Sequence, residues 1–310
     1  MKGKDLLSVA DLTSDDISRL ISDAVDLKAA GWLSTLSGKT LAIMFEKPSL
    51  RTRVSFELAM RQLGGQTIYL SPAEVGLGKR EAVSDVARVL SRYVDAVAAR
   101  TFSHQSLEAL ASYASVPVIN ALSDWEHPCQ ALADLLTIYE KKGELQGLAL
   151  AFVGDGNNVA RSLMLAASLS GMSFRIASPP GYALDDKTVA LARSYADGEI
   201  VCTEDPRQAV DGADIVYTDV WASMGQEAEA EARRQVFAGY RVTDELLSLA
   251  GGEAIFMHPL PAHHGEEVAE GVIDSPRSVV FDQAENRLHL QKALLAQMLG
   301  GLEIPLAGLR

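Results

Sequence analysis

Residues 45–57 read FEKPSLRTRVSFE, and the order of strand, turn and helix in this stretch organises the chain. The apolar run at 41–45 predicts a buried strand, which Pro48 ends. Apolar residues then recur at helical spacing between positions 56 and 63, before two glycines typical of a helix end. The stretch therefore predicts the strand-to-helix junction of a parallel α/β sheet.

Four polar residues, Ser49, Arg51, Thr52 and Arg53, fall at the start of this predicted helix. Free backbone N–H groups and the positive end of the helix dipole gather there. Two hydroxyls and two guanidinium groups at such a place predict an anion site, with phosphate as the expected ligand. The alternative is a Ser or Thr helix cap beside solvated arginines.

The composition narrows the possible partners and location. The 310 residues are 48% hydrophobic and 22% charged, which is typical of globular proteins, and the length suggests two domains. The net charge of −13 argues against a nucleic-acid partner, which needs a basic footprint. Cys129 and Cys202 lack disulfide or metal spacing, and we expect neither a signal peptide nor a membrane span. A cytoplasmic location follows as an expectation.

Strand and helix patterns alternate along the chain, which predicts an α/β fold of two parallel-sheet domains joined near residues 130–145. The expected strands cover residues 41–45, 66–70, 96–99, 116–120, 148–153, 173–177, 200–202, 215–217 and 254–257. The expected helices cover residues 83–90, 107–113, 131–141, 158–170 and 285–299, with another inside 1–40 capped by Thr13, and residues 71–79 read as a loop.

Polar side chains lie where a parallel sheet binds its ligands, at the carboxyl ends of strands. Arg100 and Asp219 each follow an apolar strand, and His127 and Gln130 precede a long helix. Arg100, His127 and Gln130 together can polarise a carbonyl oxygen. A Cys129 nucleophile is disfavoured, because the spacing to His127 does not bring the two side chains together.

Residues 154–158, GDGNN, follow a strand and open a helix, as a dinucleotide-binding turn does. However, Val159 stands where that fingerprint needs a small residue, and the next strand ends at Ser178 without an acidic residue to hold a ribose. A nicotinamide oxidoreductase is therefore disfavoured. We expect instead that Asn157 or Asn158 aims its amide into a ligand cleft.

The sequence after the last strand, residues 258–261, reads HPLP. Two prolines around one leucine predict a rigid turn, with a cis peptide bond between Leu260 and Pro261. Arg287 follows at the start of the predicted C-terminal helix.

Seven stretches together resemble the aspartate/ornithine carbamoyltransferase family, over nearly the whole chain. They are FEKPSLRTRVSFE, ARTFSH, HPCQALADL, GDGNN, DVWASMGQE, HPLPAHHGEEV and FDQAENRLH, and the Ser-Met-Gly loop is specific for the ornithine branch. The resemblance implies two Rossmann-like domains. Residues 1–140 would bind carbamoyl phosphate, with a C-terminal helix at 285–303 packed back on them, and residues 141–284 would bind ornithine.

The resemblance also assigns site residues, motif by motif. The carbamoyl phosphate-binding set would be Ser49, Leu50, Arg51, Thr52, Arg100, His127, Gln130 and Arg287. Its catalytic members would be Arg51, Arg100, His127 and Arg287. The ornithine-binding set would be Asn158, Asp219, Ser223, Met224, Pro259 and Leu260. No metal or redox cofactor is implied.

The implied reaction transfers the carbamoyl group from carbamoyl phosphate to the δ-amine of L-ornithine, giving L-citrulline and phosphate in arginine metabolism. The implied assembly is a homotrimer in which residues 74–81 reach a neighbouring subunit.

Three positions depart from the family pattern. Leu50 stands where the family usually has Thr, and Gly76 where many relatives have a polar side chain in the loop lent to the neighbour. Pro259 stands where ornithine enzymes usually have Cys, and the resulting HPLP resembles the aspartate branch. Aspartate, an N-acylornithine or putrescine therefore stay open as acceptors, as does a non-catalytic relative that only binds anions.

Overall fold

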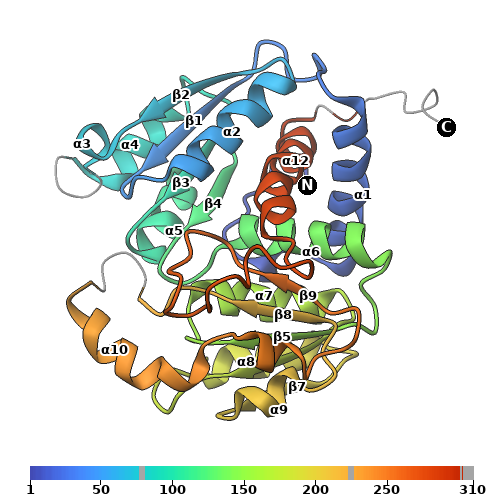
Figure 1. The fold of residues 1–310 in the computed structure, drawn as a ribbon. Coiled ribbons are helices and arrows are strands. Elements are labelled where there is room, and N and C mark those ends of the chain that lie inside the picture. The colour runs from blue at the N-terminus through green and yellow to red at the C-terminus, as the bar shows by residue number, and fades with distance from the viewer. Residues whose placement is uncertain (77–80, 223–226, 301, 303–310) are drawn as a thin grey trace. The chain divides into compact units, whose positions relative to one another are not determined.

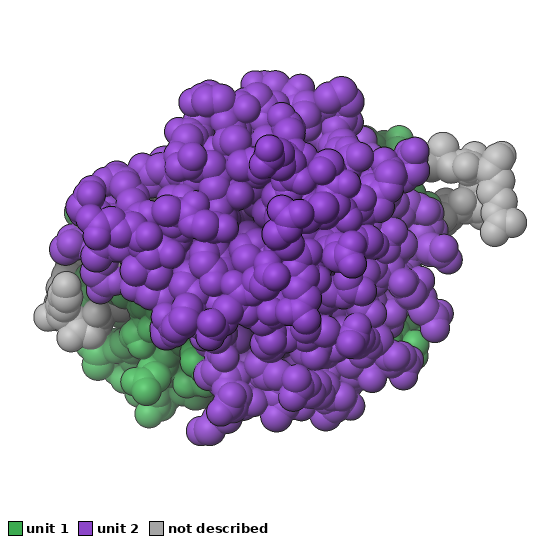
Figure 2. Space-filling view, turned by 60° about the horizontal axis from the view of Figure 1, so that its bottom comes forward, with its two compact units in different colours: residues 1–136, 285–310 green, residues 137–284 purple. Residues whose placement is uncertain are grey.

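The computed structural model describes residues 1–76, 81–222, 227–300 and 302. The chain divides into two compact units, residues 1–136 with 285–310 and residues 137–284, which Figure 2 colours green and purple. Each unit carries its own parallel β-sheet with helices packed on it (Figure 1), which confirms the predicted α/β fold.

The first unit is built on a four-stranded sheet in the order β2-β1-β3-β4, with every pair parallel. Its strands are Thr40–Phe45 (β1), Gln66–Leu70 (β2), Ala96–Arg100 (β3) and Val118–Leu122 (β4). Its helices are Val9–Asp11 (η1), Ser14–Ala30 (α1), Leu50–Gln62 (α2), Pro72–Val75 (α3), Val83–Leu90 (α4) and His104–Tyr113 (α5). Alternate residues of the strands share one core with α4 and α5, as the two-residue period of a strand requires.

The second unit is built on a five-stranded sheet in the order β7-β6-β5-β8-β9, again parallel. Its strands are Ala149–Val153 (β5), Ser173–Ala177 (β6), Ile200–Thr203 (β7), Ile215–Thr218 (β8) and Ile255–Met257 (β9). Its helices are Asn158–Leu169 (α7), Asp186–Tyr195 (α8), Pro206–Val210 (α9), Glu227–Glu229 (η2), Ala230–Phe237 (α10), Ala238–Tyr240 (η3) and Asp244–Leu247 (α11). Its core joins β5, β8 and β9 to α9 and α11.

The strand order of each sheet creates a place for a ligand. In the first sheet, β1 connects to β2 on one side and the neighbouring β3 connects to β4 on the other side, so the direction of the connections reverses between β1 and β3. In the second sheet the same reversal occurs between β5 and β8. Open α/β sheets bind ligands at the carboxyl ends of the strands at such a switch point. The turns after β1 and β3, and those after β5 and β8, are therefore where substrate groups belong.

Two long helices contain the boundaries of the units, Pro128–Lys142 (α6) and Val280–Leu299 (α12). Within the first unit, α12 packs beside α1 (Figure 1): Lys292 Nζ donates to the carbonyl oxygens of Leu27 and Gly31, each at 2.8 Å. These carbonyls end α1, where the helix dipole favours a cation. The predicted return of the C-terminal helix to the N-terminal domain is confirmed.

Most predicted elements are present, and the differences have local causes. A four-residue helix, α3, lies in the predicted loop, because Ser71 and Glu74 form a capping box around Pro72. Strand β4 begins at Val118 rather than at residue 116, directly after a proline that cannot donate to a ladder. The last helix, α12, begins at Val280 rather than at residue 285.

Helices α8 to α11 are absent from the predicted elements, although three of them carry a recognisable start signal. Asp185 caps α8, Asp205 caps α9 ahead of a proline, and Thr243 caps α11, each by accepting a backbone N–H with its side chain. These helices are too short for a helical spacing of apolar residues to be recognised with certainty in the sequence.

Candidate functional site

The start of α2 lies where the sequence predicts it. Ser49 is the N-cap, and its Oγ accepts a hydrogen bond from the backbone N–H of Thr52 at 3.4 Å. Leu50 is the first helical residue and is 77% exposed, and Arg51 is exposed beside it. The first turn of α2 contains no acidic residue, so its free N–H groups and dipole favour an anion.

Arg287 is brought to this helix start by α12. Its Nη2 donates to Oγ1 of Thr52 at 2.6 Å, and both residues are buried. The prediction that Arg287 stands at the start of the last helix is wrong, because α12 begins at Val280 and places Arg287 two turns later.

Arg100 ends β3, one strand away from β1 in the sheet, and only 6% of it is exposed. Burial lowers the pKa of the Arg100 guanidinium to about 10, with further lowering from the positive charges of Arg287 and Arg51. Its Nε has no hydrogen-bond partner among the described residues. The positive charges of these three guanidinium groups repel one another, and a bound anion would offset this repulsion.

His127 and Gln130 lie at the start of α6 and are almost fully buried. Burial, followed by the charges of Arg287 and Arg100, lowers the pKa of His127 well below 6.5. The imidazole is therefore neutral at pH 7. Gln130 Nε2 donates to Asp134 Oδ1 at 2.9 Å, which leaves Gln130 Oε1 as a buried acceptor that no described residue satisfies.

The structure argues against a Cys129 nucleophile. Cys129 is fully buried, and burial raises the pKa of its thiol to about 12. Its Sγ faces the carbonyl oxygen of Asn120 at 3.5 Å. A thiol with this pKa holds almost no thiolate at pH 7, and the thiolate is the reactive form.

In the second unit, Asp219 follows β8 and is held from two sides. Asn157 Nδ2 donates to Asp219 Oδ2 at 2.8 Å, and the backbone N–H of Val220 donates to Oδ1 at 2.8 Å. Burial raises the pKa of Asp219, against the opposing effects of the hydrogen bonds from Asn157 and from the Val220 backbone. A substrate ammonium group would be a cationic partner for this buried carboxylate and would favour its ionised form.

The GDGNN turn supplies the partner of Asp219. Asn157 caps α7, because its Oδ1 accepts from the backbone N–H groups of Val159 and Ala160. Of the two amides that the sequence leaves open, Asn157 contacts Asp219, and Asn158 is the first residue of α7.

The turn after β9 contains both prolines and is held by hydrogen bonds of His258. The Leu260–Pro261 bond is cis, which confirms that prediction, and Leu260 has a φ of 53°. His258 Nδ1 accepts from the backbone N–H of Leu260 at 3.0 Å, so the ring proton is on Nε2, which donates to Glu267 at 3.2 Å. These bonds hold the backbone of Pro259 and Leu260 after the strand.

Part of the predicted site lies outside the described residues. Ser223 and Met224 lie outside the described residues, and so do residues 77–80 of the predicted neighbour-reaching loop 74–81. The described beginning of that loop includes the end of α3 and Gly76, which has a φ of 45°.

One cluster of metal-ligand type occurs in the described part of the chain: His263, Glu266 and Glu267, with candidate ligand atoms within 4.8 Å of one another. Arg234 Nε already donates to Glu266 Oε1 at 2.9 Å, and Glu267 Oε1 accepts from His258. The cluster is therefore organised as an ion-pair network, and no metal chemistry follows from it.

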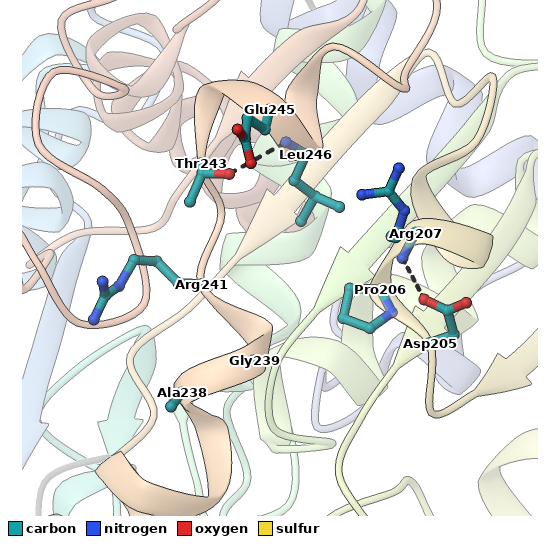
Figure 3. Close-up of a pocket in the computed structure, with 9 residues that line it drawn as sticks. All are labelled: Asp205, Pro206, Arg207, Ala238, Gly239, Arg241, Thr243, Glu245 and Leu246. Carbon is teal, nitrogen blue, oxygen red and sulfur yellow. Dashed lines mark hydrogen bonds between the residues drawn. The ribbon is translucent and has the colours of Figure 1, made fainter.

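A hollow of about 410 Å³ lies elsewhere in the second unit (Figure 3). Its lining residues are Asp205, Pro206, Arg207, Ala238, Gly239, Arg241, Thr243, Glu245 and Leu246. None of them belongs to the predicted site. Among the described residues, no helix is both long and apolar enough to cross a membrane.

Two family models together match most of the chain. A family described as aspartate/ornithine carbamoyltransferase, carbamoyl-P binding domain, matches residues 4–140, and its Asp/Orn binding domain matches residues 146–298. The ornithine carbamoyltransferase of Anoxybacillus flavithermus is 55% identical over 96% of this chain and 98% of that protein. The anabolic ornithine carbamoyltransferase of Pyrococcus furiosus is 52% identical over 98% of each. A solved ornithine carbamoyltransferase structure from Pyrococcus furiosus superimposes with a TM-score of 0.94 at 52% identity, covering 97% of this chain and 99% of that one.

Proposed function

The chain belongs to the aspartate/ornithine carbamoyltransferase family, and on this premise we propose that it is the transferase that carbamoylates the δ-amine of L-ornithine. The products are L-citrulline and phosphate. The Pyrococcus furiosus relative is named an anabolic ornithine carbamoyltransferase, and this name supports a role in arginine biosynthesis. The name of the Anoxybacillus flavithermus relative supports ornithine as the acceptor.

The observation that carries the proposal is the group of three arginines beside a neutral His127 in the first unit. Arg51, Arg100 and Arg287 are close enough for Arg51 and Arg287 to lower the pKa of Arg100. Such a cluster suits a dianionic phosphate attached to a carbonyl. In an acidic protein of net charge −13, this concentration of positive charge is local and specific.

We propose that the phosphate of carbamoyl phosphate binds at the start of α2. Ser49, Thr52 and the backbone N–H of Leu50 would donate to its oxygens, and Arg51 would add a charge-assisted contact. The departure at Leu50 removes a hydroxyl of the family pattern, and a backbone donor can serve in its place.

The carbamoyl group would lie against the buried polar groups. Arg100 and the neutral imidazole of His127 would donate to its carbonyl oxygen, and Arg287 would complete the donors around the carbonyl and phosphate. Gln130 Oε1, a buried acceptor without a described partner, would accept from the carbamoyl NH₂. This pairing satisfies an atom that is otherwise costly to bury.

The chemistry follows from where charge develops. The δ-amine attacks the carbamoyl carbon, negative charge grows on the carbonyl oxygen, and the C–O bond to phosphate breaks. Donors already fixed at both oxygens lower the barrier, and each such donor is typically worth about 10²–10³ in rate. The amine must be neutral to attack, since its free pKa is near ~10.4. We propose that the proton it releases passes to the departing phosphate.

Ornithine would be held by the second unit. Asp219 would pair with the α-ammonium, with Asn158, Ser223 and Met224 completing the amino-acid contacts. The carbonyl oxygens of Pro259 and Leu260 would accept from the δ-amine, which a proline does not prevent because it lacks only the N–H.

The same residues argue against the other acceptors. An N-acylornithine has no α-ammonium, so its binding would leave Asp219 buried and unpaired, which is costly. Putrescine has no carboxylate for the proposed contact with Asn158. The aspartate branch has an Arg directly after HPLP to bind a second carboxylate, but this chain has Ala262.

We further propose a cytoplasmic homotrimer, with residues 74–81 reaching the site of a neighbouring subunit. Large apolar side chains that are exposed on the first unit support association. Leu50 and Val54 lie one turn apart on α2 and are 77% and 42% exposed. Ile68 is 48% exposed on the edge strand β2. The exposed pair on α2 is the kind of apolar surface that a protein interface covers.

A citrulline assay with purified protein tests the proposed reaction. Carbamoyl phosphate would be offered with L-ornithine, L-aspartate, N-acetyl-L-ornithine or putrescine, and a reaction without enzyme corrects for spontaneous carbamoylation. We expect kcat/KM for ornithine to exceed that for aspartate by at least ~10³, because a mismatched ligand leaves buried polar groups unpaired. Faster carbamoylation of another amine would overturn the ornithine assignment. If no amine gave a product, the remaining interpretation would be a non-catalytic relative that only binds anions.

A further inference from the structure

Arg233 on α10 is a buried residue that the reaction outlined above does not use. It is 6% exposed, and its guanidinium makes three directed contacts. Nη1 donates to Asp155 Oδ2 at 2.7 Å and to the carbonyl oxygen of Trp221 at 2.9 Å. Nε donates to Glu229 Oε2 at 3.1 Å, and the ring of Tyr182 lies 4.9 Å from the guanidinium carbon.

The first two contacts belong to the two turns that carry the amino-acid site. Asp155 lies in the GDGNN turn after β5, and Trp221 lies two residues beyond Asp219 in the segment after β8. Strands β5 and β8 are neighbours at the switch point of the sheet. One guanidinium nitrogen therefore ties the two turns together, in parallel with the Asn157–Asp219 hydrogen bond.

The geometry suits arginine and no other cation. The guanidinium holds its donors in a rigid plane, so one group can serve Asp155 and the Trp221 carbonyl through Nη1 while Nε reaches Glu229. A lysine ammonium is a compact point charge on a flexible stem and cannot keep the same fork. Buried ion pairs contribute little net stability but are costly to break on one side.

Arg233 also contacts one of two neighbouring acids. The carboxylates of Asp155 and Asp219 lie close enough that Asp219 raises the pKa of Asp155, in addition to the larger effect of burial. Arg233 opposes both effects through its hydrogen bond and charge. The repulsion between the two carboxylates is mutual, so the loss of this cation would favour protonation of either acid.

We propose that Arg233 is a positioning residue for the amino-acid substrate, holding the Asp155 and Trp221 turns so that the Asp219 carboxylate keeps its place. Arg233 touches no substrate in this scheme and acts through Asp219. The inference deepens the proposed function, because it assumes that Asp219 receives an ammonium group.

Two variants separate the geometric role from the electrostatic one. Arg233→Lys keeps the charge and loses the fork, so the KM for the amine should rise at least ~10-fold, as expected for one lost buried charge-assisted hydrogen bond. The KM for carbamoyl phosphate should stay within about twofold, since its proposed ligands lie in the other unit. Arg234→Lys is the matched control: it is the next residue on α10, and it pairs at the surface with Glu231 and Glu266.

Arg233→Gln removes the charge and reports on protonation. In the wild type, log kcat/KM for the amine should steepen at the pH where Asp219 gains a proton, and in Arg233→Gln this break should move to higher pH. The charged and titratable groups around the two acids are Arg233, Glu229, His258 and Glu267. Arg233→Gln keeps all of these groups except Arg233, so a shift of the break in the pH profile reports the loss of this one cation.

The readouts distinguish the possible failures. Equal effects on the KM of both substrates, or no effect of either variant, would refute the positioning role. Should both Arg233 variants fail to fold by circular dichroism, Asp155→Asn carries the test, and an unchanged KM for the amine would then refute the role. The amine tested is whichever one the wild type carbamoylates. An acceptor other than ornithine would correct the proposed function without affecting this comparison.

Discussion

Arg287 donates a hydrogen bond to Thr52 at 2.6 Å, although 235 positions of the chain separate them. The bond joins the start of α2 to α12, so the end of the chain completes the group of cations at the beginning of the first unit. Both side chains are buried, and Thr52 Oγ1 also accepts from Ser49 Oγ at 3.0 Å. The hydroxyl of Thr52 therefore orders the N-cap and a proposed phosphate ligand together.

Arg51→Ala should weaken carbamoyl phosphate binding at least ~10-fold, because a charge-assisted contact is worth about 1.5–3 kcal/mol and ~1.4 kcal/mol is a factor of ten. The melting temperature without ligand should stay nearly unchanged, since Arg51 is exposed. Isothermal titration calorimetry measures the affinity. Arg53→Ala is the matched control, because Arg53 is engaged elsewhere, with Glu57 at 2.8 Å and over the ring of Tyr69. Equal losses in both variants would contradict a specific site.

Thr52→Val should destabilise the protein by about 1–3 kcal/mol, the usual cost of removing one partner of a buried polar group. It should also weaken carbamoyl phosphate binding, because Arg287 loses an acceptor that orients it. Chemical denaturation and calorimetry measure the two effects. Thr52→Ser keeps the hydroxyl and should stay near the wild type in both. A Thr52→Val protein as stable as the wild type would show that this bond has no structural importance.

Asp219→Asn should raise the KM for ornithine about 10²-fold, since truncating one side of a buried charge pair costs about 2–5 kcal/mol. The pH dependence gives a second check. The δ-amine must lose a proton, so log kcat/KM should fall with a slope of about one below its pKa, and of about two once Asp219 is also protonated. Burial raises the pKa of Asp219, so this break should lie above the ordinary value of 3.8. In Asp219→Asn the slope should remain about one, and a persisting break would assign it to another group.

Asp185→Asn should lower stability at neutral pH but not in strong acid. Burial alone would raise the pKa of Asp185, but hydrogen bonds from Arg161 and Thr188 lower it from 3.8 to about 2. The ionised form is therefore stabilising above about pH 4, and this contribution is lost as the pH falls toward 2. The carboxylate is partly exposed, so we expect about 1 kcal/mol or less.

Thermal unfolding from pH 7 down to pH 2 measures this effect. Asparagine also caps helices well, so Asp185→Asn isolates the charge from the cap. Asp186→Asn, one residue later and exposed, is the control that changes the same net charge without losing the Arg161 contact. A constant difference between Asp185→Asn and the wild type at every pH would contradict the assigned linkage.

Light scattering should give a mass near three times that of the 33.2-kDa chain, or a multiple of it. If residues 74–81 contribute to a neighbouring site, isolated monomers should be inactive. Activity measured across a dilution series, with the mass measured at the same concentrations, checks this. An active monomer at assay concentration would exclude a shared site.

The sequence by itself determined the features that depend on near neighbours. The strand before Pro48, the Ser49 cap, the Thr13 capping box and the cis Leu260–Pro261 bond were all predictable, because each depends on residues a few positions apart. The alternation of strands and helices was sufficient for the α/β class in the same way. The seven quoted stretches also resemble the family that the comparisons identify.

Only the tertiary structure decided which distant groups meet and how their protons behave. No local pattern places Arg287 against Thr52 or Arg233 between Asp155 and Trp221, because these contacts depend on how helices return to the sheets. The neutral state of His127 and the inert thiol of Cys129 are likewise tertiary properties. Both follow from burial and from the surrounding charges, and those are set by the packing of elements far apart in the chain.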